Sequence, residues 1–223
     1  MLREFGINDV LYLLESVRWT LFLSAIAFVG GGIVGGLVTL ARLSRIGPLR
    51  WFAIGYVELL QGTPLLMQLF LWFFMLTLLV PVELPATIVA AIALTLNASS
   101  FATEIWRGSI DAIPKTQWES AASIGMTRLQ QLYYIIVPQA VRIAIAPTVG
   151  LAVIIIKATS LASLIGFVEV TRAGQLISGV TFQPLLTYGI AALIYLALCL
   201  PLSILSRRLE RNLDVSRSPE LGH

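Results

Sequence analysis

The sequence predicts an all-α integral membrane protein with five transmembrane helices. Of its 223 residues, 57% are hydrophobic and only 12% are charged, whereas soluble domains carry about 25% charged residues. The mean hydropathy is +0.88. Apolar runs of about 20 residues, the length that crosses the ~30 Å hydrocarbon core as a helix, alternate with short polar or basic segments. The single cysteine, Cys199, leaves no pair for a disulfide within the chain.

The first apolar run, residues 19–41, predicts the first span. A mildly amphipathic segment, residues 1–18, precedes it; we expect this segment outside the cytoplasm, with Asn8 as a helix N-cap. The segment either lies on the membrane surface or runs straight into the span. Small residues four apart, including Gly31 and Gly35, permit another helix to approach closely, and we favour a helix of the same chain over a dimer partner.

The second span, residues 51–80, contains a helix break at Gly62-Thr63-Pro64. Pro64 lacks a backbone donor, and its ring clashes with the carbonyl group of Leu60. In lipid such a break persists only where protein or a water-filled cavity satisfies the freed backbone groups. A tight connection over residues 81–85 follows.

The remaining spans follow from the same criterion of length. The third begins at residue 84 or 86 and ends at 106, the fourth runs from about 139 to at least 157, and the fifth covers 185–205. Residues 158–184 predict a short helix and a loop. Residues 19–206 therefore form the transmembrane domain, and residues 207–223 form a frayed cytoplasmic tail.

Basic residues predict which side of the membrane each loop faces, because cytoplasmic loops are enriched in lysine and arginine. Five spans place the two termini on opposite sides. With the N-terminus outside, ten basic residues lie inside and four outside. The inside residues are Arg42, Arg45, Arg50, Arg107, Lys115, Arg128, Arg207, Arg208, Arg211 and Arg217, and the outside residues are Arg3, Arg18, Lys157 and Arg172.

Residues 107–138 form a polar loop on the predicted cytoplasmic side. Residues 113–124 predict a short helix, and Gly125 can adopt the left-handed conformation that ends it. Residues 126–134 begin a second short helix with apolar positions at helical spacing. Two short helices around a glycine corner form a protrusion that fits a groove on another protein. The alternative is a solvated hairpin without a partner.

This loop carries a recognisable pattern: Glu119-Ser120-Ala121, three residues, Gly125, nine residues, and then a segment ending in Val137-Pro138. It resembles the EAA loop of the permease subunits of ABC importers. It departs from that pattern at Ser120 and Val137, and both changes keep the size and the helix compatibility of the position. The resemblance implies a coupling helix that docks into an ATP-hydrolysing subunit through Glu119, Ser120, Ala121, Gly125 and Pro138.

The wider stretch from Asn97 to Gln175, together with Gly62-Thr63-Pro64, resembles the polar amino-acid uptake permeases in particular. This resemblance implies the type I ABC-importer permease fold in the inner membrane of a bacterium. It also implies a second permease subunit, identical or different, and an extracytoplasmic amino-acid-binding protein as partners.

The chain lacks the residues for chemistry of its own. It has no G-x-x-x-x-G-K-[ST] phosphate loop, so we expect ATP and magnesium on the partner subunit and no cofactor or enzymatic activity here. No His, Cys and carboxylate cluster suggests a metal site. The net charge of +3 and the pI near 9.3 fit cytoplasmic basic loops in contact with lipid better than a nucleic-acid partner.

Polar residues within the spans are the candidate substrate site, because such residues are costly in lipid and usually face a bundle interior. The resemblance implies that Lys157 binds the carboxylate of an amino acid; the alternative is a lysine that extends to the outer headgroups. Spacings of three and seven place one polar stripe on a single helical face, which lines a pathway or bonds to other helices. Asn97 is a further candidate, and the stripe consists of Glu58, Gln61 and Gln68.

Three other charged residues have predicted surroundings. Glu104 and Arg107 lie three residues apart at the inner end of the third span, so we expect them to pair. The segment 163–179, which includes Glu169, is expected outside the membrane. The resemblance implies that it contacts the binding protein, and the alternative is an interfacial amphipathic helix.

Two other functions are compatible with the composition. One is an ion-gradient-driven carrier or channel subunit that works without an ATPase, and the other is a membrane scaffold. A carrier requires a relay of intramembrane acids or a repeated fold. Glu58 and Glu104 are one candidate acid pair, and the sequence shows no clear inverted repeat.

Overall fold

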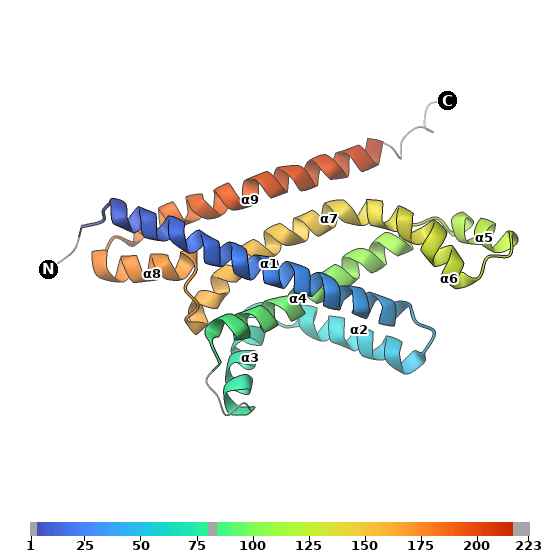
Figure 1. The fold of residues 1–223 in the computed structure, drawn as a ribbon, viewed down its shortest axis with the longest axis horizontal. Coiled ribbons are helices and arrows are strands. Elements are labelled where there is room, and N and C mark those ends of the chain that lie inside the picture. Colours follow the sequence, from blue (N-terminus) through green and yellow to red (C-terminus); the bar gives the residue numbers. More distant parts are fainter. Residues whose placement is uncertain (1–3, 80–83, 216–223) are drawn as a thin grey trace.

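The structure is a computed structural model that describes residues 4–79 and 84–215, and for residues 212–215 the backbone only. In these ranges the regular secondary structure is entirely helical, without a strand. Four of the described helices are long and apolar enough to cross a membrane, and the number is five if the bent helix pair of residues 47–79 counts as one span. The predicted all-α fold class is confirmed. Figure 1 shows an elongated bundle in which α1 (Ile7–Leu43), α4 (Ala86–Asp111) and α7 (Val137–Ala158) form the centre.

Helix α1 (Ile7–Leu43) is continuous, so the segment before the first span runs straight into it. The prediction of Asn8 as the N-cap is wrong: the cap is Gly6, whose backbone N–H donates to the carboxylate of Asp9 at 2.9 Å. Asp9 occupies the third helical position, from which its side chain reaches back to the backbone N–H of the cap residue.

Helix α1 packs most extensively against α4 (Ala86–Asp111). A Cβ atom added to Gly31 would lie 2.7 Å from the Cβ atom of Ala98, and one added to Gly35 would lie 2.8 Å from the Ser99 carbonyl oxygen. Thr103 also donates a hydrogen bond to the Gly35 carbonyl group at 3.1 Å. The small residues therefore serve packing within the chain, as predicted.

The predicted break at Gly62-Thr63-Pro64 separates α2 (Gly47–Gly62) from α3 (Leu65–Leu79), and the two helices are bent by 107°. The prediction of one polar face through Glu58, Gln61 and Gln68 is consequently wrong. Pro64 ends the first helix, so Gln68 belongs to a second helix with its own direction. Most of the predicted connection 81–85 lies outside the described residues.

The polar loop differs from prediction in its second half. Helix α5 (Lys115–Ser123) is the predicted short helix. Residues Arg128–Gln130 (α6) then continue through a π-helical turn, Gln131–Ile136, into α7 (Val137–Ala158). There is no second separate short helix, and the fourth span begins well before residue 139. The wider π turn offers room for the ring of Pro138 beside the carbonyl group of Tyr134, where a regular α-helix would clash.

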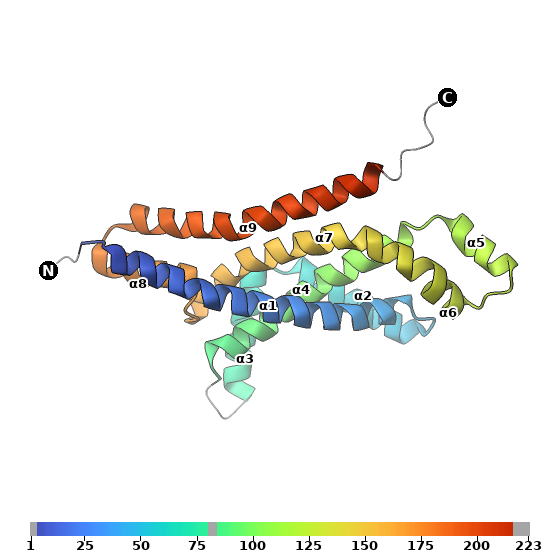
Figure 2. The ribbon, with the colours of Figure 1, turned by 45° about the horizontal axis from the view of Figure 1, so that its top comes forward.

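Helix α7 passes into a 3₁₀ turn (Thr159–Ile165), and α8 (Val170–Thr181) then packs between α1 and α9 (Pro184–Val215). The prediction of a frayed tail from residue 207 is wrong as far as residue 215, because α9 continues to Val215. Residues 216–223 lie outside the described part of the chain. Only 11% of the most apolar window of α9 is buried, and Figure 2 shows this helix along one side of the bundle.

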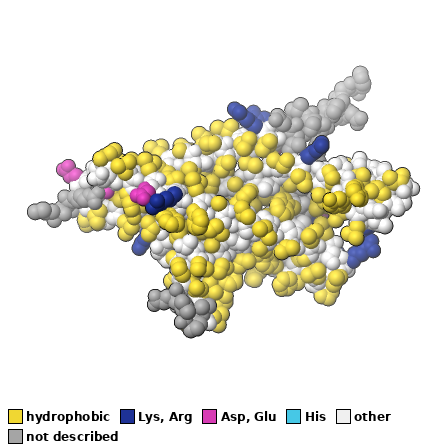
Figure 3. Space-filling view, viewed as in Figure 1, with side chains coloured by type: hydrophobic (Ala, Val, Ile, Leu, Met, Phe, Trp, Pro, Cys, Tyr) yellow, Lys and Arg dark blue, Asp and Glu magenta, His cyan; other side chains and the backbone are white. Residues whose placement is uncertain are grey.

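The two ends of the bundle differ. In Figures 1 and 2, α5 and α6 lie at the same end as the C-terminal end of α9, while α8 and the beginning of α1 lie at the other end. Apolar side chains cover most of the surface between the ends in Figure 3, with few charged groups among them. This distribution is that of a protein whose middle part faces lipid.

Candidate functional site

The protruding helix α5 has a buried face and an exposed face. Ala121 is buried, and Trp118 packs against an apolar cluster that includes Ile113 and Ile136. Glu119 and Ser120 lie on the exposed face. The helix is thus held to the base of α4 and α7 by its apolar side, and it presents its polar side to the surroundings.

Gly125 ends this helix in the predicted left-handed conformation, with φ of +79°. The backbone N–H of Met126 donates to the carbonyl group of Ala121 at 3.2 Å, and the N–H of Gly125 donates to that of Ala122 at 3.0 Å. These two bonds constitute the Schellman motif. Thr127 then caps α6 by accepting a hydrogen bond from the backbone N–H of Gln130. Pro138 is exposed in the first turn of α7, where a proline is tolerated.

A charged network lies near the C-terminal ends of α1 and α4. Glu104 accepts hydrogen bonds from Arg107, as predicted, and also pairs with Arg42 of α1. Arg107 reaches on to Asp111, 2.5 Å away. The network joins the first and third spans close to the protruding helix. The pairing of Glu104 with Arg42 of α1, 62 residues earlier in the chain, was not predicted.

Three predicted polar residues meet around the helix break. The side-chain amide nitrogen of Gln68 donates to the Leu60 and Thr63 carbonyl groups at 2.6 and 3.0 Å. Its amide oxygen accepts from Asn97 at 3.2 Å, and Gln61 donates to the Ser100 carbonyl group at 3.1 Å. Gln68 thus satisfies carbonyl groups at the break, Asn97 holds the Gln68 side chain, and Gln61 links α2 to α4. Their part in substrate binding stays a prediction. Glu58 remains exposed.

Lys157 lines a different feature, a groove of about 690 Å³ between the end of α7, the start of α8 and α9. We call it the α7–α9 groove. From Tyr188 to Arg207 it follows 19 residues of α9, roughly 28 Å at 1.5 Å per residue. It is lined by Lys157, Ser160, Thr171, Tyr188, Ala191, Ala192, Tyr195, Leu196, Cys199, Leu200, Ser203 and Arg207. The groove therefore combines two cations, several hydroxyl groups and apolar walls, a lining suited to a small polar molecule with a carboxylate.

Glu169 is completely buried, and its hydrogen-bond partner Tyr195 lines this groove. The location of its segment on the outer side of the membrane stays a prediction. Glu169 caps α8: its carboxylate accepts from the backbone N–H groups of Thr171 and Arg172 at 2.9 and 2.8 Å. The hydroxyl group of Tyr195 donates to the same carboxylate. Glu169 lies between the fourth and fifth spans. Burial raises the pKa of Glu169 above its ordinary value, and the hydrogen bonds oppose this increase.

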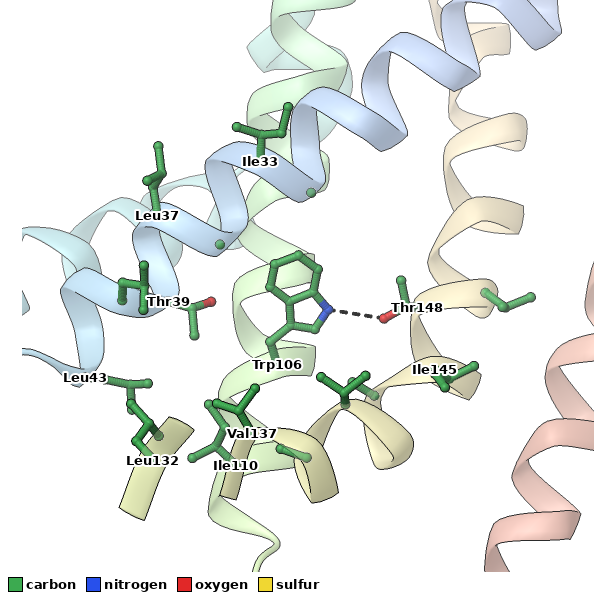
Figure 4. A pocket seen from close by; sticks show the side chains of 17 residues that line it. Ile33, Leu37, Thr39, Leu43, Trp106, Ile110, Leu132, Val137, Ile145 and Thr148 are labelled. Atoms are coloured by element: carbon green, nitrogen blue, oxygen red, sulfur yellow. Dashed lines mark hydrogen bonds between the residues drawn. The ribbon is translucent and has the colours of Figure 1, made fainter. Parts of the chain in front are cut away.

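A second cavity, of about 760 Å³, lies between α1, α4 and α7. Figure 4 shows Trp106 of α4 at its centre, with its indole N–H directed to Thr148 of α7. The other lining side chains are almost all apolar. A cavity of this kind offers no partner for the charged ends of an amino acid, so it is a poor candidate for a polar substrate despite its size.

Apolar spans, a protruding capped helix and a polar groove define a membrane transport subunit. Residues 20–215 match the family described as "Binding-protein-dependent transport system inner membrane component". The chain belongs to this family.

Individual relatives are permease proteins. The L-cystine transport system permease protein TcyB of Bacillus subtilis (strain 168) is 40% identical over 199 residues, which cover 89% of this chain and 85% of the relative. The glutamine transport system permease protein GlnP of Escherichia coli (strain K12) is 31% identical over 204 residues, which cover 91% and 93%.

Solved structures show the same fold. A crystal structure of an amino acid ABC transporter with histidines has a TM-score of 0.88 at 32% identity and covers 92% of this chain and 96% of that chain. The MetNI methionine ABC transporter has a TM-score of 0.77 at 16% identity, and the match covers 93% of this chain and 99% of that chain. At this identity the similarity is one of fold. The predicted type I permease fold and the predicted family are confirmed.

Proposed function

We propose that this chain is the permease subunit of an ATP-driven importer of a polar amino acid. The observation that supports this most directly is helix α5, whose exposed face carries Glu119 and Ser120 and whose end is fixed by Gly125. Such a helix transmits a movement of a docked ATPase to α4 and α7, the helices that it packs against. ATP and magnesium bind to the ATPase subunit.

The orientation has α5 and the end of α9 in the cytoplasm and the beginning of α1 outside the inner membrane of a bacterium. The basic loops support this orientation, as does the position of α5 and α6 at the same end of the bundle as the end of α9 (Figure 1). An extracytoplasmic binding protein delivers the substrate at the α8 end. The exposed side of α9 faces a second permease subunit.

The substrate passes along the α7–α9 groove, with Lys157 as the partner of its carboxylate. Lys157 is exposed in this groove at the end of α7, and an ammonium group held beside apolar walls attracts a carboxylate more strongly than it does in water. The relatives transport cystine and glutamine by name, which supports an amino acid as the substrate class.

An ion-driven carrier is less well supported. Glu104, one of the two acids such a relay would use, is neutralised by Arg42 and Arg107. A carboxylate held between two arginines releases and binds a proton poorly near neutral pH.

The test is uptake into proteoliposomes that contain the permease, its ATPase and the binding protein. Lys157→Gln should reduce kcat/KM for the transported amino acid about ten-fold, because one charged contact of this kind contributes on the order of 1.4 kcal/mol. Arg18→Gln is the matched control, since Arg18 pairs with Glu15 on α1 away from the groove. Unchanged kinetics in Lys157→Gln would exclude the carboxylate role. Uptake that persists without the ATPase would exclude the importer.

The orientation is tested separately by labelling single cysteines. In a chain with Cys199→Ala, a cysteine introduced in place of Glu119 should react with an impermeant maleimide only from the cytoplasmic side. Reaction from the outer side would contradict the proposed topology.

A further inference from the structure

The buried carboxylate of Glu169 has no charged partner. In the part of the chain that the structure describes, its three hydrogen-bond donors are the backbone N–H groups of Thr171 and Arg172 and the hydroxyl group of Tyr195, all of them uncharged. The nearby Arg172 side chain donates to Gln175 instead. A buried anion without a cation is costly in a medium of low dielectric constant. The groove beside Glu169 is therefore a place where a positive charge is stabilised.

Tyr195 connects this carboxylate to the α7–α9 groove, because its side chain both lines the groove and donates to Glu169. A phenol has one proton, so in the 3.1 Å contact between the hydroxyl groups of Tyr195 and Thr171 it is Thr171 that donates. The hydroxyl group of Thr159 also lies near the phenolic oxygen, but it donates its proton to the Ile156 carbonyl group at 2.7 Å, so one lone pair of the phenolic oxygen stays available. Donation to an anion increases the negative charge on this oxygen, which strengthens it as an acceptor.

Tyr195 and Lys157 lie next to the same apolar cluster between α7 and α9. Ile156, the neighbour of Lys157 on α7, packs in one apolar cluster with Cys199, and Tyr195, one turn before Cys199 on α9, packs against that cluster. Tyr195 is eleven residues from the beginning of α9, roughly 16 Å along the helix. The groove thus offers a cation from α7 and a polarised acceptor from α9, both next to one apolar cluster.

We propose that Tyr195, held by the buried Glu169, binds the α-ammonium group of the amino acid whose carboxylate binds Lys157. Glu169 is a positioning residue: it is completely buried and acts through Tyr195. The pair makes the groove selective for α-amino acids over carboxylic acids that lack the amino group. This inference rests on the proposed function and names the group of the substrate that the site distinguishes.

The experiment measures equilibrium binding to the permease–ATPase complex in nanodiscs, without the binding protein, whose own selectivity would mask that of the groove. The probes are L-glutamine, L-cystine and L-histidine, each with its des-amino acid as competitor. In the wild type the amino acid that binds most tightly should bind at least ten-fold more tightly than its des-amino acid. Tyr195→Phe should weaken binding of the amino acid about ten-fold and leave that of the des-amino acid unchanged. Glu169→Gln should act in the same direction.

The matched control is Tyr12→Phe, which removes an exposed hydroxyl group on α1 that does not line the groove. This variant should keep the wild-type ratio of the two affinities, that for the amino acid and that for its des-amino acid. A wild-type ratio in Tyr195→Phe would overturn the inference. So would an equal loss for both ligands, which indicates a structural role. If none of the three amino acids binds to the wild type, the groove is not an amino-acid site and the proposed function fails with it. If the wild type binds an amino acid but Tyr195→Phe does not change the ratio of the affinities for the amino acid and its des-amino acid, only the role of Tyr195 is overturned.

Discussion

The conformation of Gly125 permits a quantitative test of the coupling helix. At φ of +79°, a Cβ atom added to Gly125 would meet no other atom within 4 Å. A substitution therefore changes only the conformational energy of the backbone. For alanine the left-handed conformation costs about 1–2 kcal/mol, which reduces the population of the Schellman motif roughly 5- to 30-fold. Helix α5 has only nine residues, a length that is not stable without such a cap and its packing.

Uptake and ATPase activity stimulated by the binding protein, measured in proteoliposomes, should therefore follow the order glycine, asparagine, alanine, valine at position 125. Asparagine tolerates the left-handed region, and valine is β-branched and tolerates it least. We expect about five-fold less uptake for Gly125→Ala and at least ten-fold less for Gly125→Val. Gly108→Ala is the control, because it is exposed in α4 and also has open space around its Cβ position. Wild-type uptake in Gly125→Val, or a larger loss for asparagine than for alanine, would refute the reasoning.

Three further predictions concern stability, measured by thermal or detergent unfolding of the purified complex. Gly35→Ala should destabilise the complex by about 1–2 kcal/mol, because its Cβ atom would meet the α4 backbone. The control Gly55→Ala, which has open space around its Cβ position, should be neutral or stabilising. Equal changes in stability for the two variants would contradict the close packing at Gly35. Glu104→Gln should cost about 2 kcal/mol, since it leaves two arginines of the network without their carboxylate; an unchanged midpoint would show that the network is not stabilising. Burial raises the pKa of Glu169, so its protonated form is favoured in the folded state over the unfolded state. The contribution of this group to the stability of the fold is therefore complete below about pH 4 and is lost as the pH rises through the raised pKa. The wild type should thus lose stability relative to Glu169→Gln from about pH 4 upward, and parallel curves would contradict this.

Local chemistry made part of the structure predictable. Pro64 removes a backbone donor whatever its surroundings, so the break after α2 could be placed from the sequence. Gly125 could be identified as the end of α5, because glycine adopts the left-handed conformation without strain. The face of Gln68 could not be assigned, because the periodicity of one helix no longer holds beyond a bend. The continuity of α6 with α7 was also missed, since a proline near position 138 normally marks a helix start, and the π turn before it follows from packing.

The candidate site was predictable residue by residue but not as an arrangement. Lys157 was identified as an intramembrane cation, and the structure places it in a groove. Its neighbour Tyr195 gave no signal, because a tyrosine within an apolar run is ordinary in a membrane helix. The burial of Glu169 depends on Tyr195, 26 residues later on another helix, a pairing that the spacing of a sequence does not reveal.

The exposed flank of α9 has a consequence for how the protein is made in the cell. Only 11% of its apolar window is buried, so in the proposed transporter we expect this helix to be stabilised further by contact with the second permease subunit. A copy synthesised in excess of its neighbours should be removed by membrane proteases, and its abundance should rise when the missing subunit is co-expressed. The stoichiometry of the transporter would then be set by turnover as well as by synthesis.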